Sequence, residues 1–195
     1  MTQEKSLSKE EVQEFVVAGH FNLDKVQKML TANPALLNAV YDWGTQGGPE
    51  TAVQASAHVG NRVIAEFLLG KGAPLEICTA AMLNRDEDVR GRIRADAQMA
   101  KAAGAHGITL LAHAAFSRNP ALVRFVYESG GIAGASLALQ NAVTTGNVEI
   151  VQWLLDNAGA EIDSKNFEGK TPLRVAKDRN DQMMVKLLSG RGATG

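Results

Sequence analysis

The stretch that decides the fold runs from residue 166 to residue 193 and reads NFEGKTPLRVAKDRNDQMMVKLLSGRGA. Within it, Thr171 precedes Pro172, a pair that predicts the start of a helix. The threonine side chain can accept hydrogen bonds from free backbone N–H groups, and proline fits the first helical position. Leu173 and Ala176 lie three residues apart and therefore share one face of this helix. An apolar second helix follows and ends at two glycines, so the stretch predicts one helix–turn–helix unit.

Residues 169–176, GKTPLRVA, resemble the ankyrin-repeat signature G-x-T-P-L-H-x-A, with Arg174 where the family usually has histidine. The resemblance is clearest over Asn166–Ala193, and weaker copies extend back to about residue 21. It implies an all-α solenoid of stacked helix pairs, with β-turn fingers between the pairs. It also implies a non-enzymatic scaffold or adaptor that presents a concave surface to a protein partner.

A small residue paired with an apolar residue nine positions later recurs along the chain and marks further copies of the unit. The small residue lies late in the first helix, and the apolar residue lies in the second. Stacked units of this kind bury a continuous core that a single unit could not bury. The pairs are Val17 with Val26, Ser56 with Ala65, Ala80 with Val89, Ala114 with Val123, Ala142 with Val151, and Ala176 with Val185.

These copies predict about six helix pairs, whose short helices are held by packing rather than by their own stability. Unequal spacing between the copies predicts two shortened junctions and three longer β-turn fingers. A second internal similarity aligns the stretch Leu30–Ala39 with the stretch Ile93–Ala102. The helices are expected at 8–17, 22–32, 51–59, 61–70, 77–83, 86–95, 109–117, 120–129, 135–145, 147–157, 171–179 and 181–189. The fingers are expected at about 38–50, 102–109 and 160–171, and the short junctions at 72–76 and 130–134.

We expect one solenoid over residues 1–193 with a polar cap at each end, because a terminal repeat has one face against solvent. The N-terminal cap is expected at 1–20, and the C-terminal cap repeat at 166–190. Residues 191–195 are expected to form a frayed tail.

Composition limits the classes of function. The chain has 195 residues, of which 45% are hydrophobic, and this argues against disorder. Lys plus Arg number 20 against 21 for Asp plus Glu, so no strong field attracts nucleic acid or anionic lipid. We see no apolar run long enough to span a membrane and no signal peptide. One cysteine, Cys78, excludes an internal disulfide and fits a cytoplasmic location.

The histidines show no metal-ligand spacing, because no two are three or four residues apart and none lies near Cys78 in the sequence. We interpret them as residues that make local hydrogen bonds, and Cys78 as a buried, inert thiol. The sequence therefore assigns no catalytic residue, no cofactor and no metal. The histidines are His20, His58, His106 and His113.

An alternative function stays open. Stacked helices lie about 10 Å apart, so first-helix histidines of adjacent repeats could approach one another. His58, His106 and His113 would then form a small-molecule or metal site, with hydrolytic activity as one option.

The family resemblance implies a partner-binding stripe made from finger tips and the exposed ends of first helices. Aromatic residues and methionine lie near its centre, between polar ends, which is the composition of an interface core. A second interpretation is that the aromatic fingers fold back and that the central apolar residues pack between helices. The expected partner-binding residues are Tyr41, Asp42, Trp43, His58, Val59, Met82, Leu83, Phe116, Thr144 and Asp178.

These observations predict a monomer with a protein partner, and neither nucleic acid nor membrane as a partner. An exposed patch of Trp43 and Phe116 would instead support a dimer.

Overall fold

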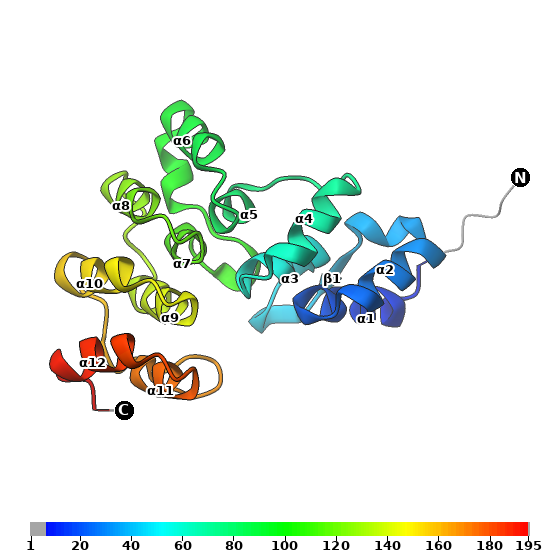
Figure 1. Cartoon of the computed structure of the whole chain (residues 1–195). Coiled ribbons are helices and arrows are strands. Elements are labelled where there is room, and N and C mark those ends of the chain that lie inside the picture. The colour runs from blue at the N-terminus through cyan, green and yellow to red at the C-terminus, as the bar shows by residue number, and fades with distance from the viewer. Residues whose placement is uncertain (1–6, 195) are drawn as a thin grey trace, which may run out of the picture.

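The computed structural model describes residues 7–194, in which six consecutive helix pairs stack into an open, curved array (Figure 1). This confirms the all-α helix–turn–helix solenoid. The predicted helices match the observed bounds closely, except that the first continues to Phe21. The pairs are α1 (Lys9–Phe21) with α2 (Leu23–Ala32), α3 (Ala52–His58) with α4 (Arg62–Gly70), α5 (Ile77–Met82) with α6 (Asp86–Ala95), α7 (Leu110–Ala115) with α8 (Pro120–Glu128), α9 (Ala135–Thr145) with α10 (Val148–Asn157), and α11 (Pro172–Asp178) with α12 (Gln182–Gly190).

Polar N-cap residues start many of the helices and follow a repeating pattern. The side chains of Thr51, Thr109 and Thr171 each accept a hydrogen bond from the backbone N–H three residues later, at the start of a first helix that follows a finger. Asparagine caps second helices in the same way. The asparagine caps are Asn22, Asn61, Asn119 and Asn147.

Three of the asparagine caps also contact the preceding helix pair through the side-chain amide, Asn119 by donating to Oδ1 of Asn84 at 2.9 Å. Nδ2 of Asn61 donates to the carbonyl of His20 at 3.0 Å. Nδ2 of Asn147 donates to the carbonyl of Arg118 at 3.2 Å. The same residue therefore fixes where a second helix begins and how that helix sits against the previous pair.

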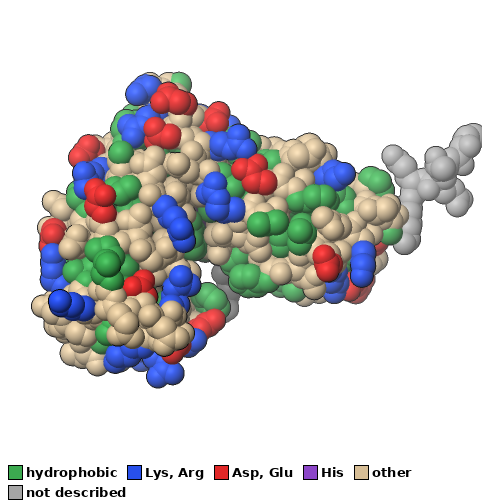
Figure 2. All heavy atoms as spheres, in the orientation of Figure 1, with side chains coloured by type: hydrophobic (Ala, Val, Ile, Leu, Met, Phe, Trp, Pro, Cys, Tyr) green, Lys and Arg blue, Asp and Glu red, His purple; other side chains and the backbone are tan. Residues whose placement is uncertain are grey.

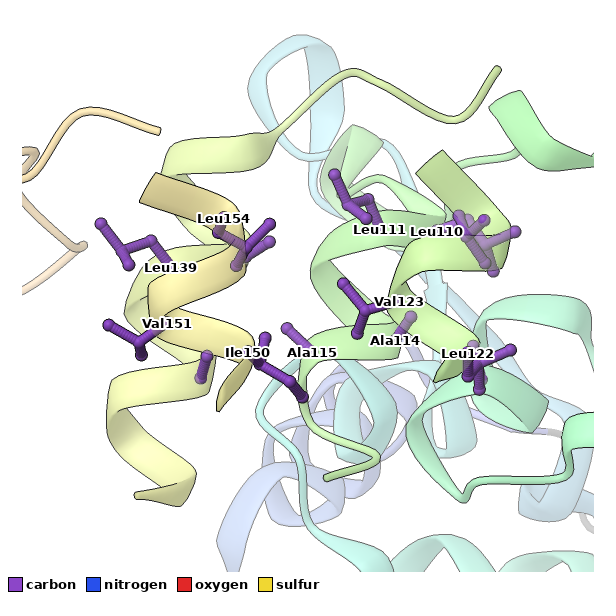
Figure 3. Close-up of a cluster of buried hydrophobic side chains, with 14 of the residues drawn as sticks. Leu110, Leu111, Ala114, Ala115, Leu122, Val123, Leu139, Ile150, Val151 and Leu154 are labelled. Atoms are coloured by element: carbon purple, nitrogen blue, oxygen red, sulfur yellow. The ribbon is translucent and has the colours of Figure 1, made fainter. Parts of the chain in front are cut away.

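The buried apolar side chains form two main clusters, one on each side of the junction between α4 and α5. We call residues 7–73 the N-terminal block and residues 77–194 the C-terminal block. Figure 3 shows part of the C-terminal core, where leucine, isoleucine and valine side chains of α7 to α10 pack around alanines. A smaller cluster joins the blocks and consists of Ala57, Ala65, Met82, Leu83 and Phe116.

The small residues that mark the repeats are fully buried in five of the six copies. Ser56, Ala80, Ala114, Ala142 and Ala176 each have 0% of their surface exposed. The first copy is different, because Val17 is 51% exposed while its neighbour Val16 is 0% exposed. Adjacent helical residues point about 100° apart, so only one of the two can face the core. The assignment of Val17 is therefore wrong, and Val16 takes its place.

Fingers are present at the three expected places. The first is an antiparallel hairpin of β1 (Val40–Asp42) and β2 (Pro49–Thr51), in which Tyr41 lies opposite Glu50. The second contains one bridge, between Ala103 and Thr109. The third is a turn closed by a hydrogen bond from the N–H of Asn166 to the carbonyl of Lys170.

Short 3₁₀ segments complete the connections. The segments η1 (Pro34–Asn38) and η3 (Ala97–Lys101) both follow a second helix and lie at equivalent positions of the second internal similarity, while η2 (Gly44–Gln46) and η4 (Ala105–Gly107) lie at finger tips. At the second short junction the chain packs too closely for a side chain. A Cβ atom on Gly131 would lie only 2.3 Å from the carbonyl oxygen of Ala100.

The structure describes more of the C-terminal end than of the N-terminal end. Residues 1–6 of the expected N-terminal cap, and the last residue of the expected tail, lie outside the described residues. The rest of that tail is attached to the preceding repeat, because Arg191 pairs with Asp156 and Thr194 donates from its N–H and its hydroxyl to Asp163. Among the described residues, no helix has the length and apolar character needed to cross a membrane.

Candidate functional site

A groove of about 710 Å³ runs along the concave side of the array. Its walls come from the ends of α1, α3 and α7, from α9 and α11, and from the second and third fingers. Figure 2 shows the corresponding hollow between the C-terminal pairs and the arm formed by the N-terminal block. The groove therefore brings together side chains from both blocks.

Half of the predicted partner-binding residues line this groove, namely His58, Val59, Phe116, Thr144 and Asp178. Two further aromatic side chains line it and are strongly exposed, Phe21 at 71% and Phe167 at 89%. Phe21 was not predicted, because α1 is longer than the sequence pattern indicated.

Met82 and Leu83 do not line the groove. For them the second interpretation holds, in which the central apolar residues pack between helices. They are only 0% and 2% exposed, packed in the cluster that joins the two blocks. The guanidinium of Arg62 donates to both of their carbonyls at 2.9 Å. Both side chains pack against Ala57, Ala65 and Phe116. Phe116 belongs to the same cluster, but it also lines the groove.

The first finger folds back onto the N-terminal block. Tyr41 and Trp43 pack on the N-terminal core, and their rings meet edge to face with centroids 4.6 Å apart. Asp42 accepts a hydrogen bond from the N–H of Gly44 and so shapes the finger tip. These three predicted residues do not line the groove.

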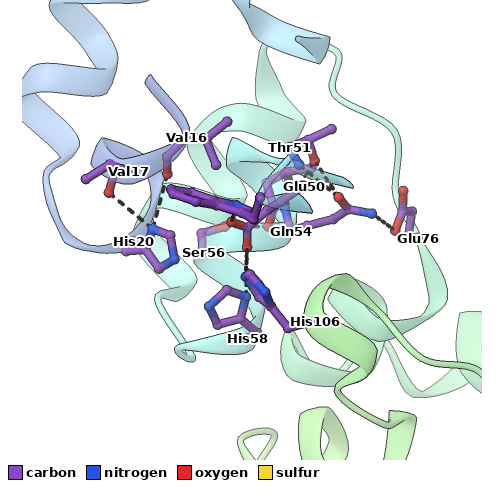
Figure 4. Close-up of polar contacts among 12 residues, drawn as sticks. Val16, Val17, His20, Glu50, Thr51, Gln54, Ser56, His58, Glu76 and His106 are labelled. Atoms are coloured by element: carbon purple, nitrogen blue, oxygen red, sulfur yellow. Dashed lines mark hydrogen bonds and ion pairs between the residues drawn. The ribbon is translucent and has the colours of Figure 1, made fainter. Parts of the chain in front are cut away.

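One buried carboxylate organises the wall of the groove nearest this finger (Figure 4). The side chain of Glu50, on β2, is 0% exposed. Its Oε2 accepts a hydrogen bond from the indole N–H of Trp43 at 2.8 Å. Its Oε1 lies 3.0 Å from Nδ1 of His58 and 3.2 Å from Nε2 of His106. Burial raises the pKa of Glu50, but His58 and Trp43 lower it by more, so the net shift is downward.

A third imidazole completes the cluster. The ring centroid of His58 lies 4.9 Å from that of His20 and 5.0 Å from that of His106. Nδ1 of His20 is 3.2 Å from the carbonyl oxygens of Val16 and Val17. Because a carbonyl only accepts, Nδ1 carries the proton, and Nε2 of the neutral ring keeps its lone pair. Burial lowers the pKa of His20, which favours this neutral form.

The structure brings together His58 and His106 of the alternative site but not His113. His113 is 1% exposed, and its Nδ1 donates to the carbonyl of Thr109 at 2.9 Å. Burial lowers its pKa to about 4. Including His113 in that site was therefore wrong, because its buried ring lies against Gly104 and does not line the groove. Cys78 is buried as predicted, and burial raises its pKa to about 12.

Sequence reasoning missed Glu50 and His20 as members of the cluster. One signal was available for Glu50, because it stands directly before the helix cap Thr51 in a finger that departs from the usual signature. His20 was expected near the end of the first helix, but nothing in the sequence indicated that it meets His58 and Glu50.

A comparison with known protein families finds ankyrin repeats within the C-terminal block. Residues 111–194 match the family model described as ankyrin repeats in three copies. A stretch of 55 residues is 40% identical to "I-Kappa-B like protein C2" of Microplitis demolitor bracovirus (isolate Webb). That match covers 28% of this chain and 30% of the viral protein, so the chain spans under a third of that relative. The carboxylate Glu50 lies outside the residues that match the family model.

Proposed function

Because residues 111–194 of this chain are ankyrin repeats, we propose that it is a non-enzymatic scaffold or adaptor whose groove holds a protein partner. The observation that carries the proposal is the pair of exposed phenylalanines, Phe21 and Phe167, at opposite walls of the groove. Large apolar side chains gathered in a concave exposed site are typical of interaction surfaces.

The lining of the groove suggests the chemistry of the partner. Its centre contains apolar side chains such as Val59, Ile108 and Phe116. Towards α11 the lining is charged, with Lys170 bridging Glu168 and Asp178 at 2.9 and 3.1 Å. A segment with apolar anchor residues and a polar flank would complement both parts.

Within this proposal, His58, Val59, Phe116, Thr144 and Asp178 contact the partner directly, together with the two phenylalanines. Tyr41, Asp42 and Trp43 act indirectly, by holding the first finger in place. Met82 and Leu83 are not included, because they are packed in the core.

The proposal extends to the setting of the protein. We infer a monomer in a reducing compartment such as the cytoplasm, with neither nucleic acid nor membrane as partner. The near-zero formal charge of −1 and the single, buried Cys78 support this.

The test is affinity capture from cells of the native host with three versions of the chain as bait. The double variant F21A/F167A is expected to lose at least about tenfold of the captured partner, since buried aromatic anchors dominate interface energies. The matched control is V63A/M183A, which removes two side chains that are 64% and 69% exposed but lie outside the groove. Equal capture of every partner by both double variants would contradict the proposal.

A further inference from the structure

The wall of the groove gathers three side chains of the types that bind metal ions. His20, Glu50 and His58 come from α1, β2 and α3, and each offers one ligand atom within 4.8 Å of the others. His106 adds a fourth group, because its Nε2 lies 3.2 Å from Oε1 of Glu50. Three repeats of the stack supply this arrangement, which no short sequence motif describes.

Oε1 of Glu50 lacks a hydrogen bond of good geometry. It is buried, and two imidazole nitrogens lie at ion-pair distance from it, at 3.0 and 3.2 Å, without forming such a bond. Nδ1 of His58 is likewise buried without an aligned partner. Leaving a buried carboxylate oxygen without a good partner is unfavourable, and a cation between these atoms would satisfy both.

Neighbouring groups hold His20 and Glu50 in fixed orientations, as outer-shell contacts do for ligands in metal sites. Nδ1 of His20 donates to the backbone carbonyls of Val16 and Val17, which leaves Nε2 available as a ligand. Trp43 donates to Oε2 of Glu50 and fixes the carboxylate from the other side. Such outer contacts to a carbonyl and a carboxylate set the tautomer and direction of metal-binding side chains.

We propose that His20, Glu50 and His58 bind one divalent transition-metal ion, with zinc as the best match, and that His106 is the fourth ligand. Imidazole and carboxylate are usual zinc ligands, and four of them suit its tetrahedral preference. Ligand atoms around tetrahedral zinc are about 3.4 Å apart, so the ligand atoms that are more distant, up to 4.8 Å, move closer together on binding. The ion has a path to the site, because all three histidines line the groove.

The inference goes beyond the proposed binding function and stands apart from it, since metal binding is measured on the chain alone. Binding would also tie the two blocks together, because His106 belongs to the C-terminal block and the other ligands to the N-terminal block. The test is titration of the metal-stripped full chain with zinc chloride by isothermal calorimetry. One zinc ion per chain is expected.

Variants then assign the ligands. E50Q and H58Q are each expected to weaken zinc binding at least about 100-fold, the upper range for losing even an outer-shell contact. H106Q is expected to weaken it by about tenfold. The matched control is C78S. It removes a thiol, a strong type of zinc ligand, from a buried position outside the cluster. This variant should leave the affinity for zinc unchanged. Circular dichroism checks that every variant folds.

If a variant fails to fold, X-ray absorption of the zinc-loaded, unmodified chain decides the matter. Imidazole and oxygen scattering without sulfur is the expected result. Absence of stoichiometric binding, a sulfur ligand, or unchanged affinity in folded E50Q and H58Q would each overturn the proposal.

Discussion

The two blocks of the array are built from the same helix pairs but differ in what they bury. In the C-terminal block, the first helices pack through alanines such as Ala114 and Ala142, within one continuous apolar cluster. The N-terminal block has its own apolar cluster, but it also buries the carboxylate of Glu50 against the histidines of the groove wall. Residues 111–194 of the C-terminal block match the family model, and the polar cluster lies where the two blocks meet. The regular repeats form the stack, whereas the first finger contributes the buried carboxylate of the polar cluster.

The largest expected effect tests whether the blocks are separate folding units. Leu139→Ala and Leu68→Ala each remove a fully buried side chain, one from each block, and each should lower the free energy of unfolding by about 3 kcal/mol. Trp153 reports on the C-terminal block and Trp43 on the N-terminal block, so each is followed by fluorescence in a variant whose other tryptophan is phenylalanine. We expect each leucine variant to shift mainly the urea transition of its own block, because repeat arrays unfold through nearest-neighbour contacts. Identical shifts at both tryptophans would show that the blocks unfold as one unit.

Acidification should destabilise the C-terminal block through His113, by less free energy than a leucine truncation. The pKa of His113 is lowered from 6.5 to about 4, so below pH 6.5 the unfolded chain binds more protons than the folded chain. The resulting stability is complete above pH 6.5 and is lost as the pH falls towards 4. Between pH 7 and pH 5 the loss amounts to about 2 kcal/mol. Urea unfolding followed at Trp153 should show this loss in the parent chain, whereas H113Q should show little pH dependence. A parent chain equally stable at both pH values would contradict the role of His113.

The smallest expected effect concerns a feature that both blocks share. Asn61→Ala in the N-terminal block and Asn147→Ala in the C-terminal block each remove a helix cap and an amide contact to the preceding pair. Each should lower the free energy of unfolding by about 1 kcal/mol. Matching losses from the urea midpoints would show that the repeating element works alike in both blocks. A much larger loss for Asn61, whose amide holds the carbonyl of His20, would instead link this cap to the polar cluster.

The helix pairs could be predicted from the sequence because their signals are local. Thr171 and Pro172 mark a helix start wherever they occur, and the small residues recur at positions that the helical period keeps on one face. The fingers and short junctions followed from the spacing of these residues. The one misplaced marker, Val17 in place of Val16, came from the weakest copy, where adjacent valines gave the pattern no way to choose.

Only the tertiary structure decided which side chains meet. His20 and His106 are far from Glu50 and His58 in the sequence. The four side chains converge because the stack places α1 beside α3 and folds two fingers towards the same wall. The burial of Met82 and Leu83 was decided in the same way, by their packing against Ala57, Ala65 and Phe116 of other helix pairs. A sequence period determines the face of a helix on which a residue lies, whereas the offset between repeats and the path of each finger determine what that face touches.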